Sequence, residues 1–158
     1  MAADTKLFPA GAQSLNAEST PETQMSQFLI FKSDGLLFGT NVEYVMEIIT
    51  SYMITSLPIV PKYVSGIINL RGHIIPILDI RLRLGRPPAD ESCIIVLTLG
   101  DTSLGILVDS VAQMISVSSE SILPIPERNA QELVSGMCTL PDGKTMLILD
   151  CIQLAGLQ

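Results

Sequence analysis

The sequence predicts a mainly β fold built from two similar units. From Gln27 onward, short apolar runs of strand length alternate with turn residues roughly every 8–12 positions, which is typical of small β-barrels and sandwiches. The second half of the chain repeats the order of motifs found in the first half. Hydrophobic residues make up 47% of the 158 residues and charged residues 16%, so the chain can form a substantial core.

Each expected element rests on a local pattern. The clearest strands are the apolar runs at 28–31, 74–78 and 93–97. The clearest turns are the polar and glycine-containing stretches at 33–35, 71–72, 100–101 and 141–143. Apolar residues at 42, 45, 46 and 49 have helical spacing behind Asn41, which predicts a short helix with Asn41 as its N-cap. Residues 79–84 and 150–154 predict two further short helices, each beginning at an aspartate.

An internal repeat organises the chain. A shift of 66 positions aligns residues 28–31 with 94–97, and the motifs Val-x-x-Val, Leu-Pro-Ile, Val-Ser-Gly and Ile-Leu-Asp then recur in the same order. Each unit of about 65 residues would hold about five strands, and a domain of that size buries only about 60% of its unfolded surface. We therefore expect two units packed on each other, joined at residues 86–90. Residues 1–23 show no periodicity and are expected to be a disordered tail or a leader.

Composition excludes several classes of protein. The net charge is −7, from 9 basic and 16 acidic residues, which argues against nucleic acid or an anionic membrane as the main partner. No apolar run approaches the roughly 18–20 residues of a membrane helix, and the first residues lack the apolar stretch of a secretory signal. The three cysteines form no Cys-x-x-Cys motif and are expected to be buried and reduced.

The sequence offers little catalytic or metal-binding chemistry. His73 is the single histidine and cannot supply a site with several histidine ligands. No nucleophile elbow, phosphate-binding loop or dinucleotide-binding motif is present. We expect His73 at the exposed tip of a hairpin. Asp79 and Asp150 hold equivalent repeat positions and are interpreted as helix N-caps. No metal, cofactor or small-molecule substrate is predicted.

One basic cluster stands out in an acidic chain. Arg71, Arg81, Arg83 and Arg86 lie within sixteen positions. They can be read as a solvated face of a short helix and linker. Arg71 can also be read as a partner-binding residue, because it sits at a hairpin tip where a planar guanidinium can reach another protein. Glu47 is the expected counter-charge.

The residues 57–79, which include Pro-Lys-Tyr-Val-Ser-Gly-Ile-Ile-Asn-Leu-Arg-Gly-His-Ile-Ile-Pro-Ile-Leu-Asp, closely resemble the signature of CheW, the bacterial chemotaxis coupling family. Residues 45–48 and 105–111 also resemble it. The resemblance covers about residues 25–158. It implies an all-β fold of two five-stranded SH3-like β-barrels packed on each other, with a few short helices. The domain would span 24–158, with the first barrel at about 24–88 and the second at about 89–158; exchange of a strand or helix between them is left open.

The resemblance also implies a non-catalytic adaptor. Such proteins link chemoreceptor cytoplasmic tips to the regulatory domain of the histidine kinase CheA, so the chain would be cytoplasmic and recruited to membrane-associated receptor arrays without inserting into the membrane. The receptor-binding residues carried over are Arg71, Glu47, Val45, Asn69 and Val108. The kinase-binding residues carried over are Gly66, Pro61 and Ile68.

Departures and alternatives follow from the same residues. The loop at 127–131 lacks the apolar residue that some family members present to a second kinase contact, and the tail has no family counterpart. A CheW-like scaffold of another receptor–kinase pathway, such as surface motility, would share every motif. A small enzyme with an acid–base pair between the barrels is the third reading.

Overall fold

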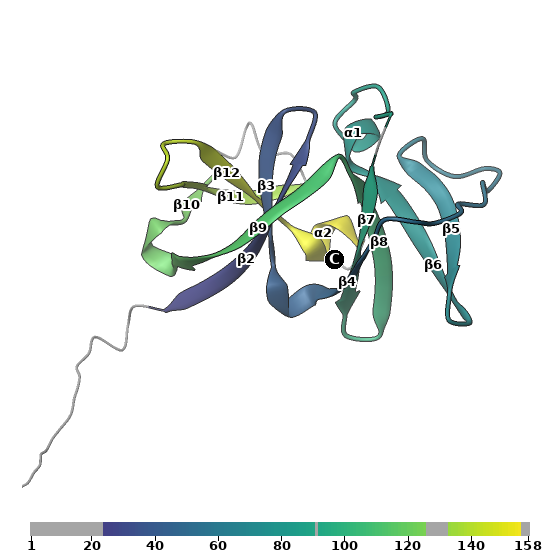
Figure 1. The fold of residues 1–158 in the computed structure, drawn as a ribbon, viewed down its shortest axis with the longest axis horizontal. Coiled ribbons are helices and arrows are strands. Elements are labelled where there is room, and N and C mark those ends of the chain that lie inside the picture. The colour runs from purple at the N-terminus through teal and green to yellow at the C-terminus, as the bar shows by residue number, and fades with distance from the viewer. Residues whose placement is uncertain (1–23, 91, 126–132, 156–158) are drawn as a thin grey trace, which may run out of the picture.

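The structure is a computed structural model that describes residues 24–90, 92–125 and 133–155 (Figure 1). Its strands are β2 (Met25–Ser33), β3 (Leu36–Asn41), β4 (Val45–Ile49), β5 (Val64–Leu70), β6 (His73–Asp79), β7 (Cys93–Leu99), β8 (Thr102–Val108), β9 (Ser110–Ser118), β10 (Leu123–Pro124), β11 (Val134–Thr139) and β12 (Thr145–Leu149). Its short helices are α1 (Ile80–Arg83) and α2 (Cys151–Leu154), and 3₁₀ turns lie at Val42–Tyr44 and Ser119–Ser121. The predictions for the tail and for residues 127–131 lie outside the described residues.

The strands form two sheets, which confirms the mainly β prediction. One sheet has the order β10-β11-β12-β3-β2-β9 and the other β4-β7-β8-β6-β5. In Figure 1 the two sheets lie side by side, with α2 between them. Within the described residues the edge strands of neither sheet pair with each other, so the expected five-stranded barrels are open and one sheet has six strands. In the six-stranded sheet, a groove of about 420 Å³ lined by side chains lies between the edge strand β9 and the end of β11.

Each sheet takes strands from both repeat units. β7 and β8 follow the expected boundary at 88/89 yet pair with β4 and β6, while β2 and β3 pair with β9 and β12. The two exchanges have the same form, because β3 runs parallel to β12 and β8 runs parallel to β6. The boundary therefore divides the repeat along the sequence but does not divide the sheets.

The parallel pairs depend on two glycines at equivalent repeat positions. Gly39 faces Ile148 across the β3–β12 pair, and Gly105 faces Ile77 across the β6–β8 pair. A Cβ on Gly39 would lie 2.5 Å from Met146 Sδ, and one on Gly105 would lie 2.6 Å from Ile77 Cδ1. The missing side chains leave space for large residues that fill the interior of each sheet.

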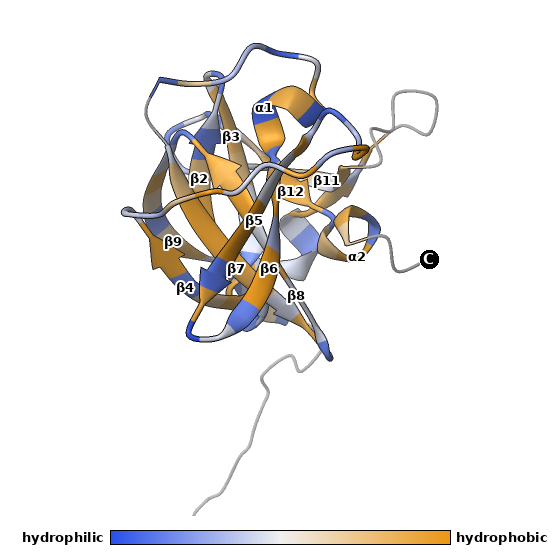
Figure 2. Ribbon diagram, turned by 90° about the vertical axis from the view of Figure 1, so that its right-hand side faces the viewer, coloured by the Kyte–Doolittle hydropathy of each residue, from blue (hydrophilic) through white to orange (hydrophobic). Residues whose placement is uncertain are grey.

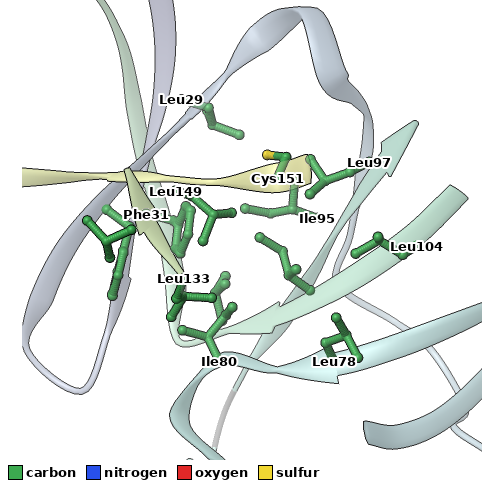
Figure 3. Packing of buried hydrophobic residues seen from close by; sticks show 14 of the residues in the cluster. Leu29, Phe31, Leu78, Ile80, Ile95, Leu97, Leu104, Leu133, Leu149 and Cys151 are labelled. Atoms are coloured by element: carbon green, nitrogen blue, oxygen red, sulfur yellow. The ribbon is translucent and has the colours of Figure 1, made fainter. Parts of the chain in front are cut away.

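Three apolar clusters hold the molecule together. One lies inside the six-stranded sheet and one inside the five-stranded sheet. The largest takes residues from both sheets and from both helices, and Figure 3 shows how its side chains converge from them. The residues labelled there are Leu29, Phe31, Leu78, Ile80, Ile95, Leu97, Leu104, Leu133, Leu149 and Cys151. Because this shared core buries one face of each sheet against the other, the two sheets pack as one body.

Strand β2 shows how the sequence serves two of these clusters at once. Phe28 and Ile30 point into the six-stranded sheet, whereas Leu29 and Phe31 point into the shared core. Both faces of a strand are then buried, which explains its continuous apolar run. Phe31 also stacks on Phe38 with ring centroids 5.3 Å apart. Figure 2 shows the same pattern in colour, with apolar residues along the strands and hydrophilic residues at many turns.

Both predicted aspartate caps are confirmed. The Asp79 carboxylate accepts hydrogen bonds from the backbone N–H groups of Arg81 and Leu82, and the Asp150 carboxylate accepts one from Gln153. Asp79 is 4% exposed, and burial raises the pKa of its carboxyl. The two caps end equivalent strands, β6 and β12, and turn the chain into α1 and α2.

The helix predicted over residues 42–49 is wrong after its first turn. Asn41 caps Val42–Tyr44 as expected, with its side chain accepting from the Glu43 N–H at 2.9 Å. The chain then continues as β4, which pairs with β7. Five residues of alternating burial fit a strand, and the β-branched side chains of Val45 and Ile49 favour it.

The three cysteines are buried, as the sequence predicts. Cys93, Cys138 and Cys151 are free and buried, and the Sγ of Cys151 lies 3.2 Å from the hydroxyl of Thr40. In the described part of the chain, no helix has the length and apolar character needed to cross a membrane.

Candidate functional site

The β5–β6 hairpin presents Arg71 at its turn. Leu70 pairs with His73, so Arg71 and Gly72 form a two-residue loop. Both have positive φ, 52° and 87°, as a type I′ turn requires. The Asn69 side chain accepts a hydrogen bond from the Gly72 N–H at 2.9 Å and holds the turn closed. Asn69 therefore shapes the tip that carries Arg71.

Arginine is an unusual residue for this turn. The β2–β3 hairpin has the same geometry at Asp34 and Gly35, with φ of 53° and 80°, and Asp-Gly is a favoured pair for type I′. Arg71 has a larger side chain and no short polar group that could bond to its own backbone in the left-handed region. Local backbone preference therefore does not explain why arginine stands at this position.

Arg71 forms a bidentate ion pair with Glu47 of β4. Its two terminal nitrogens donate to the two carboxylate oxygens at 2.7 and 3.1 Å. The Arg71 side chain is 68% exposed and that of Glu47 28%. The hydrogen bonds lower the pKa of the Glu47 carboxyl and raise the pKa of Arg71. The predicted counter-charge is confirmed, although Glu47 lies on a strand and not on a helix.

Exposed apolar side chains border this pair. Met46 is 51% exposed and Ile74 58%, and His73 lies beside them at the start of β6. We call these residues, with Arg71 and Glu47, the Arg71 surface. A shallow groove beside it is closed on the other side by the β7–β8 turn, through Asp101 and Ser103. A charged pair bordered by exposed apolar groups can bind a protein surface.

Val45 and Val108, which are also expected at the receptor site, pack in or against the shared core and not on the Arg71 surface. Val45 is half-buried against the shared core and can present only part of its side chain. Val108 is 1% exposed in the same core, so the expectation that it contacts the receptor is corrected: its side chain has no surface to offer a partner. Substitution at either position would act through packing.

Two of the three residues expected at a kinase contact are interior. Ile68 is 5% exposed inside the five-stranded sheet. Gly66 is buried with φ 146°, and a Cβ there would lie 2.1 Å from the backbone oxygen of Thr55. Pro61 alone is exposed, and its carbonyl accepts from the Val64 N–H at 2.9 Å. Gly66 thus packs closely against the loop that leads to Pro61, and both Gly66 and Ile68 are buried in this structure.

An ion-pair network at the junction of the sheets was missed by sequence reasoning. Arg81 of α1 donates to Asp109 at 2.8 and 2.7 Å and to Asp34 at 3.1 Å, and Arg86 also pairs with Asp34. Asp109 lies where the chain passes from β8 in one sheet to β9 in the other. Arg81 lowers the pKa of the Asp109 carboxyl, chiefly by hydrogen bonding. No local signal could have found these contacts, because the partners lie 28 and 47 positions from Arg81.

Within the ranges that the structure describes, no three histidine, cysteine or acidic side chains gather into a group that could hold a metal. At the β5–β6 turn the structure brings together the exposed Arg71–Glu47 pair and its apolar border. This arrangement is suited to binding another macromolecule.

Comparisons with known proteins agree with these features. The model of the CheW-like domain matches residues 27–157. The chemotaxis protein CheW of Klebsiella aerogenes is 34% identical over 134 residues, which cover 81% of this chain and 80% of that protein. The chemotaxis protein CheW of Bacillus subtilis is 33% identical over 104 residues, covering 64% of this chain and 67% of that protein. The crystal structure of the scaffolding protein TtCheW from Thermoanaerobacter tengcongensis is similar with a TM-score of 0.73 and 29% identity, covering 80% of this chain and 90% of that chain.

All three comparisons indicate the same family. The family model matches residues 27–157, two relatives are more than 30% identical, and a solved structure has the same fold. The chain therefore belongs to the CheW-like domain family, whose chemotaxis members are non-catalytic scaffolds that couple chemoreceptors to the histidine kinase CheA.

Proposed function

We propose that this chain binds a chemoreceptor cytoplasmic tip through the Arg71 surface and the regulatory domain of CheA through a separate surface near Pro61. It acts in the cytoplasm, at the membrane-associated receptor arrays. The observation that carries the proposal is the Arg71–Glu47 pair, which is bidentate, exposed and mounted on a turn that arginine does not favour.

The physical reason is that such a pair adds little to the folding stability of the isolated protein. Exposed ion pairs are screened by water and salt and contribute little to stability. When a partner covers the pair, both charges are partly desolvated and the guanidinium can bridge Glu47 and an acceptor on the partner. Truncating Arg71 would then leave unpaired charges in the interface, which weakens binding far more than folding.

The test is a titration of a receptor cytoplasmic fragment and of the purified kinase regulatory domain against wild type, Arg71→Ala and Arg71→Asn. We expect both variants to weaken receptor binding at least tenfold and to affect kinase binding less. Arg71→Asn creates an Asn-Gly turn, which suits type I′, so its melting temperature should equal or exceed that of wild type. Arg86→Ala, which removes another exposed arginine paired with an aspartate, is the matched control and should leave receptor affinity unchanged.

Two results would contradict the assignment. Receptor affinity that is unchanged in both Arg71 variants would show that Arg71 does not contact the receptor. A loss of affinity in Arg71→Asn that is accompanied by a large drop in melting temperature would show that Arg71 is structural.

A further inference from the structure

The loop between β4 and β5 carries an exposed apolar tip. Ile59 is 101% exposed, and its neighbours Leu57 and Val60 are 38% and 36% exposed. Pro58 and Pro61 flank Ile59 and Val60 and restrict the backbone on both sides of them. We call residues 57–61 the Ile59 tip. An apolar group of this kind on a rigid loop loses contact with water only when another molecule covers it.

The backbone of Ile59 is strained in the conformation that exposes it. Its φ is 55°, in the left-handed region, where β-branched residues are genuine outliers. Asparagine or glycine would adopt this conformation at lower cost. Strain of this type persists when the surrounding structure enforces it, and it gathers at functional sites.

The internal repeat supplies a direct comparison. The Leu-Pro-Ile motif at the tip recurs as Leu123-Pro124-Ile125. Ile125 has an ordinary backbone conformation and is half-buried against the shared core. The same motif therefore turns its isoleucine inward in the second unit and outward in the first. Folding gains nothing from the outward turn, so a contact outside the chain is the better explanation for it.

The Ile59 tip and the Arg71 surface lie at opposite ends of β5. The carbonyl of Pro61 anchors the tip to Val64, the first residue of that strand, while Arg71 follows its last residue. Seven residues at about 3.3 Å each separate the two ends by about 20 Å. In Figure 1 the loop that follows β4 lies at the upper right and the β5–β6 turn at the lower right. Two different partners can therefore be bound at the two ends at the same time.

The charges beside the tip define the complementary surface. The tip itself has no charged residue, but Lys62 follows it and is exposed. The Arg83 guanidinium lies 5.1 Å from the centre of the Tyr63 ring, just beyond Lys62. A partner that fits would offer an apolar socket for Ile59 with acidic groups along one rim.

We propose that Ile59 is the anchor of the kinase contact, inserted into an apolar socket with an acidic rim on the CheA regulatory domain. This rests on the proposed function, because it assigns to the kinase the end of β5 that the receptor does not use. The prolines hold the side chain in its binding position before contact, so little conformational freedom is lost when the complex forms.

The experiment compares wild type, Ile59→Asn, Ile59→Leu and Ile152→Asn as full chains. Each is titrated calorimetrically with the purified kinase regulatory domain and, separately, with a receptor cytoplasmic fragment, and each is melted alone. Ile59→Asn should weaken kinase binding at least tenfold, leave receptor binding unchanged, and melt at or above the wild-type temperature because asparagine relieves the backbone strain. Ile59→Leu should retain most of the kinase affinity. Ile152, which is 50% exposed on α2, provides the matched control and should change neither affinity.

The outcomes separate this inference from the proposed function. If wild type binds neither partner, the proposed function fails. If wild type binds both and Ile59→Asn binds the kinase domain equally well, the function stands and the anchor is wrong. A lower melting temperature of Ile59→Asn would make Ile59 structural and also overturn the anchor. Co-sedimentation of wild type, but not of Ile59→Asn, with anionic lipid vesicles would assign the tip to a lipid surface instead.

Discussion

The strand exchange between the units can be tested at the two equivalent glycines. Gly105→Ala would place a methyl group 2.6 Å from Ile77 Cδ1 and 2.8 Å from Ile94 Cγ2. Both isoleucines are fully buried in the five-stranded sheet. Gly39→Ala, at the same position of the other unit, would meet mainly the side chain of Met146.

The magnitudes differ because the neighbours differ. Overpacking a close-packed core with one methyl group costs about 1–3 kcal/mol, and two β-branched side chains leave little room to adjust, so we expect about 2 kcal/mol for Gly105→Ala. Methionine is flexible and can move its sulfur away. Alanine also loses less backbone entropy on folding than glycine. We therefore expect Gly39→Ala to cost under about 1 kcal/mol.

The assay is urea denaturation followed by circular dichroism, with a double-mutant cycle. Ile77→Val removes the Cδ1 atom nearest to the new methyl group and alone costs about 0.5–1.5 kcal/mol. Combined with Gly105→Ala it should be less destabilising than the sum of the single variants by about 1 kcal/mol. In thermal melts, Gly105→Ala should lower the midpoint by about 4–8 °C for a chain of this size.

Two results would refute this account of how β8 packs beside β6. One is that the losses of unfolding free energy in Gly105→Ala and Ile77→Val simply add in the double variant. The other is that Gly39→Ala destabilises the protein more than Gly105→Ala. The unfolding m-value is the internal check, since a change in m would mean that the compactness of a state has changed and not only the packing.

Two further predictions concern titrating groups. Because hydrogen bonding lowers the folded-state pKa of Asp109, its stabilising contribution is fully present above the unfolded pKa of about 3.9 and is lost as the pH falls through the lower folded value. Asp109→Asn should therefore flatten the acid limb of the unfolding free energy measured between about pH 5 and pH 2, and an unchanged slope would contradict the role of the Arg81 contact. Burial raises the pKa of all three cysteine thiols, so they should resist a thiol reagent in the native protein and react after unfolding in guanidinium, whereas rapid native labelling would show that the core is open.

Local and repeated patterns and one charge pair were predictable, and the pairing of distant strands was not. The aspartate caps follow from residue types next to apolar runs, and the Arg71–Glu47 pair from one basic residue at a turn. The segment 42–49 was misread because, over eight residues, apolar spacing of a helix overlaps with that of a strand. The parallel strand pairs β3–β12 and β6–β8 could not be predicted, because no residue near Gly39 or Gly105 in the sequence indicates which strand lies next to it. Val108 was misplaced for the same reason: its burial depends on the packing of the opposite sheet.

Backbone strain marks both ends of the proposed adaptor. Across residues 24–90, 92–125 and 133–155, the non-glycine residues with positive φ are Asp34, Arg71 and Ile59. Asp34 belongs to an Asp-Gly hairpin turn, where positive φ is ordinary. Arg71 and Ile59 are residues that disfavour it, both are exposed, and they stand at opposite ends of β5.

A hydrogen-bonded strand in the middle of these two sites fixes their spacing. β5 pairs with β6 from Val64 to Leu70, with an irregularity between Val64 and Gly66, and buries Ile68 in the sheet. A receptor held at Arg71 and a kinase held at Ile59 would then be kept at a constant distance and orientation. Coupling of this kind would require no conformational change within the adaptor. The strand would position the two partners relative to each other, and the local strain at each end would be the cost of presenting a charged side chain to one partner and an apolar side chain to the other.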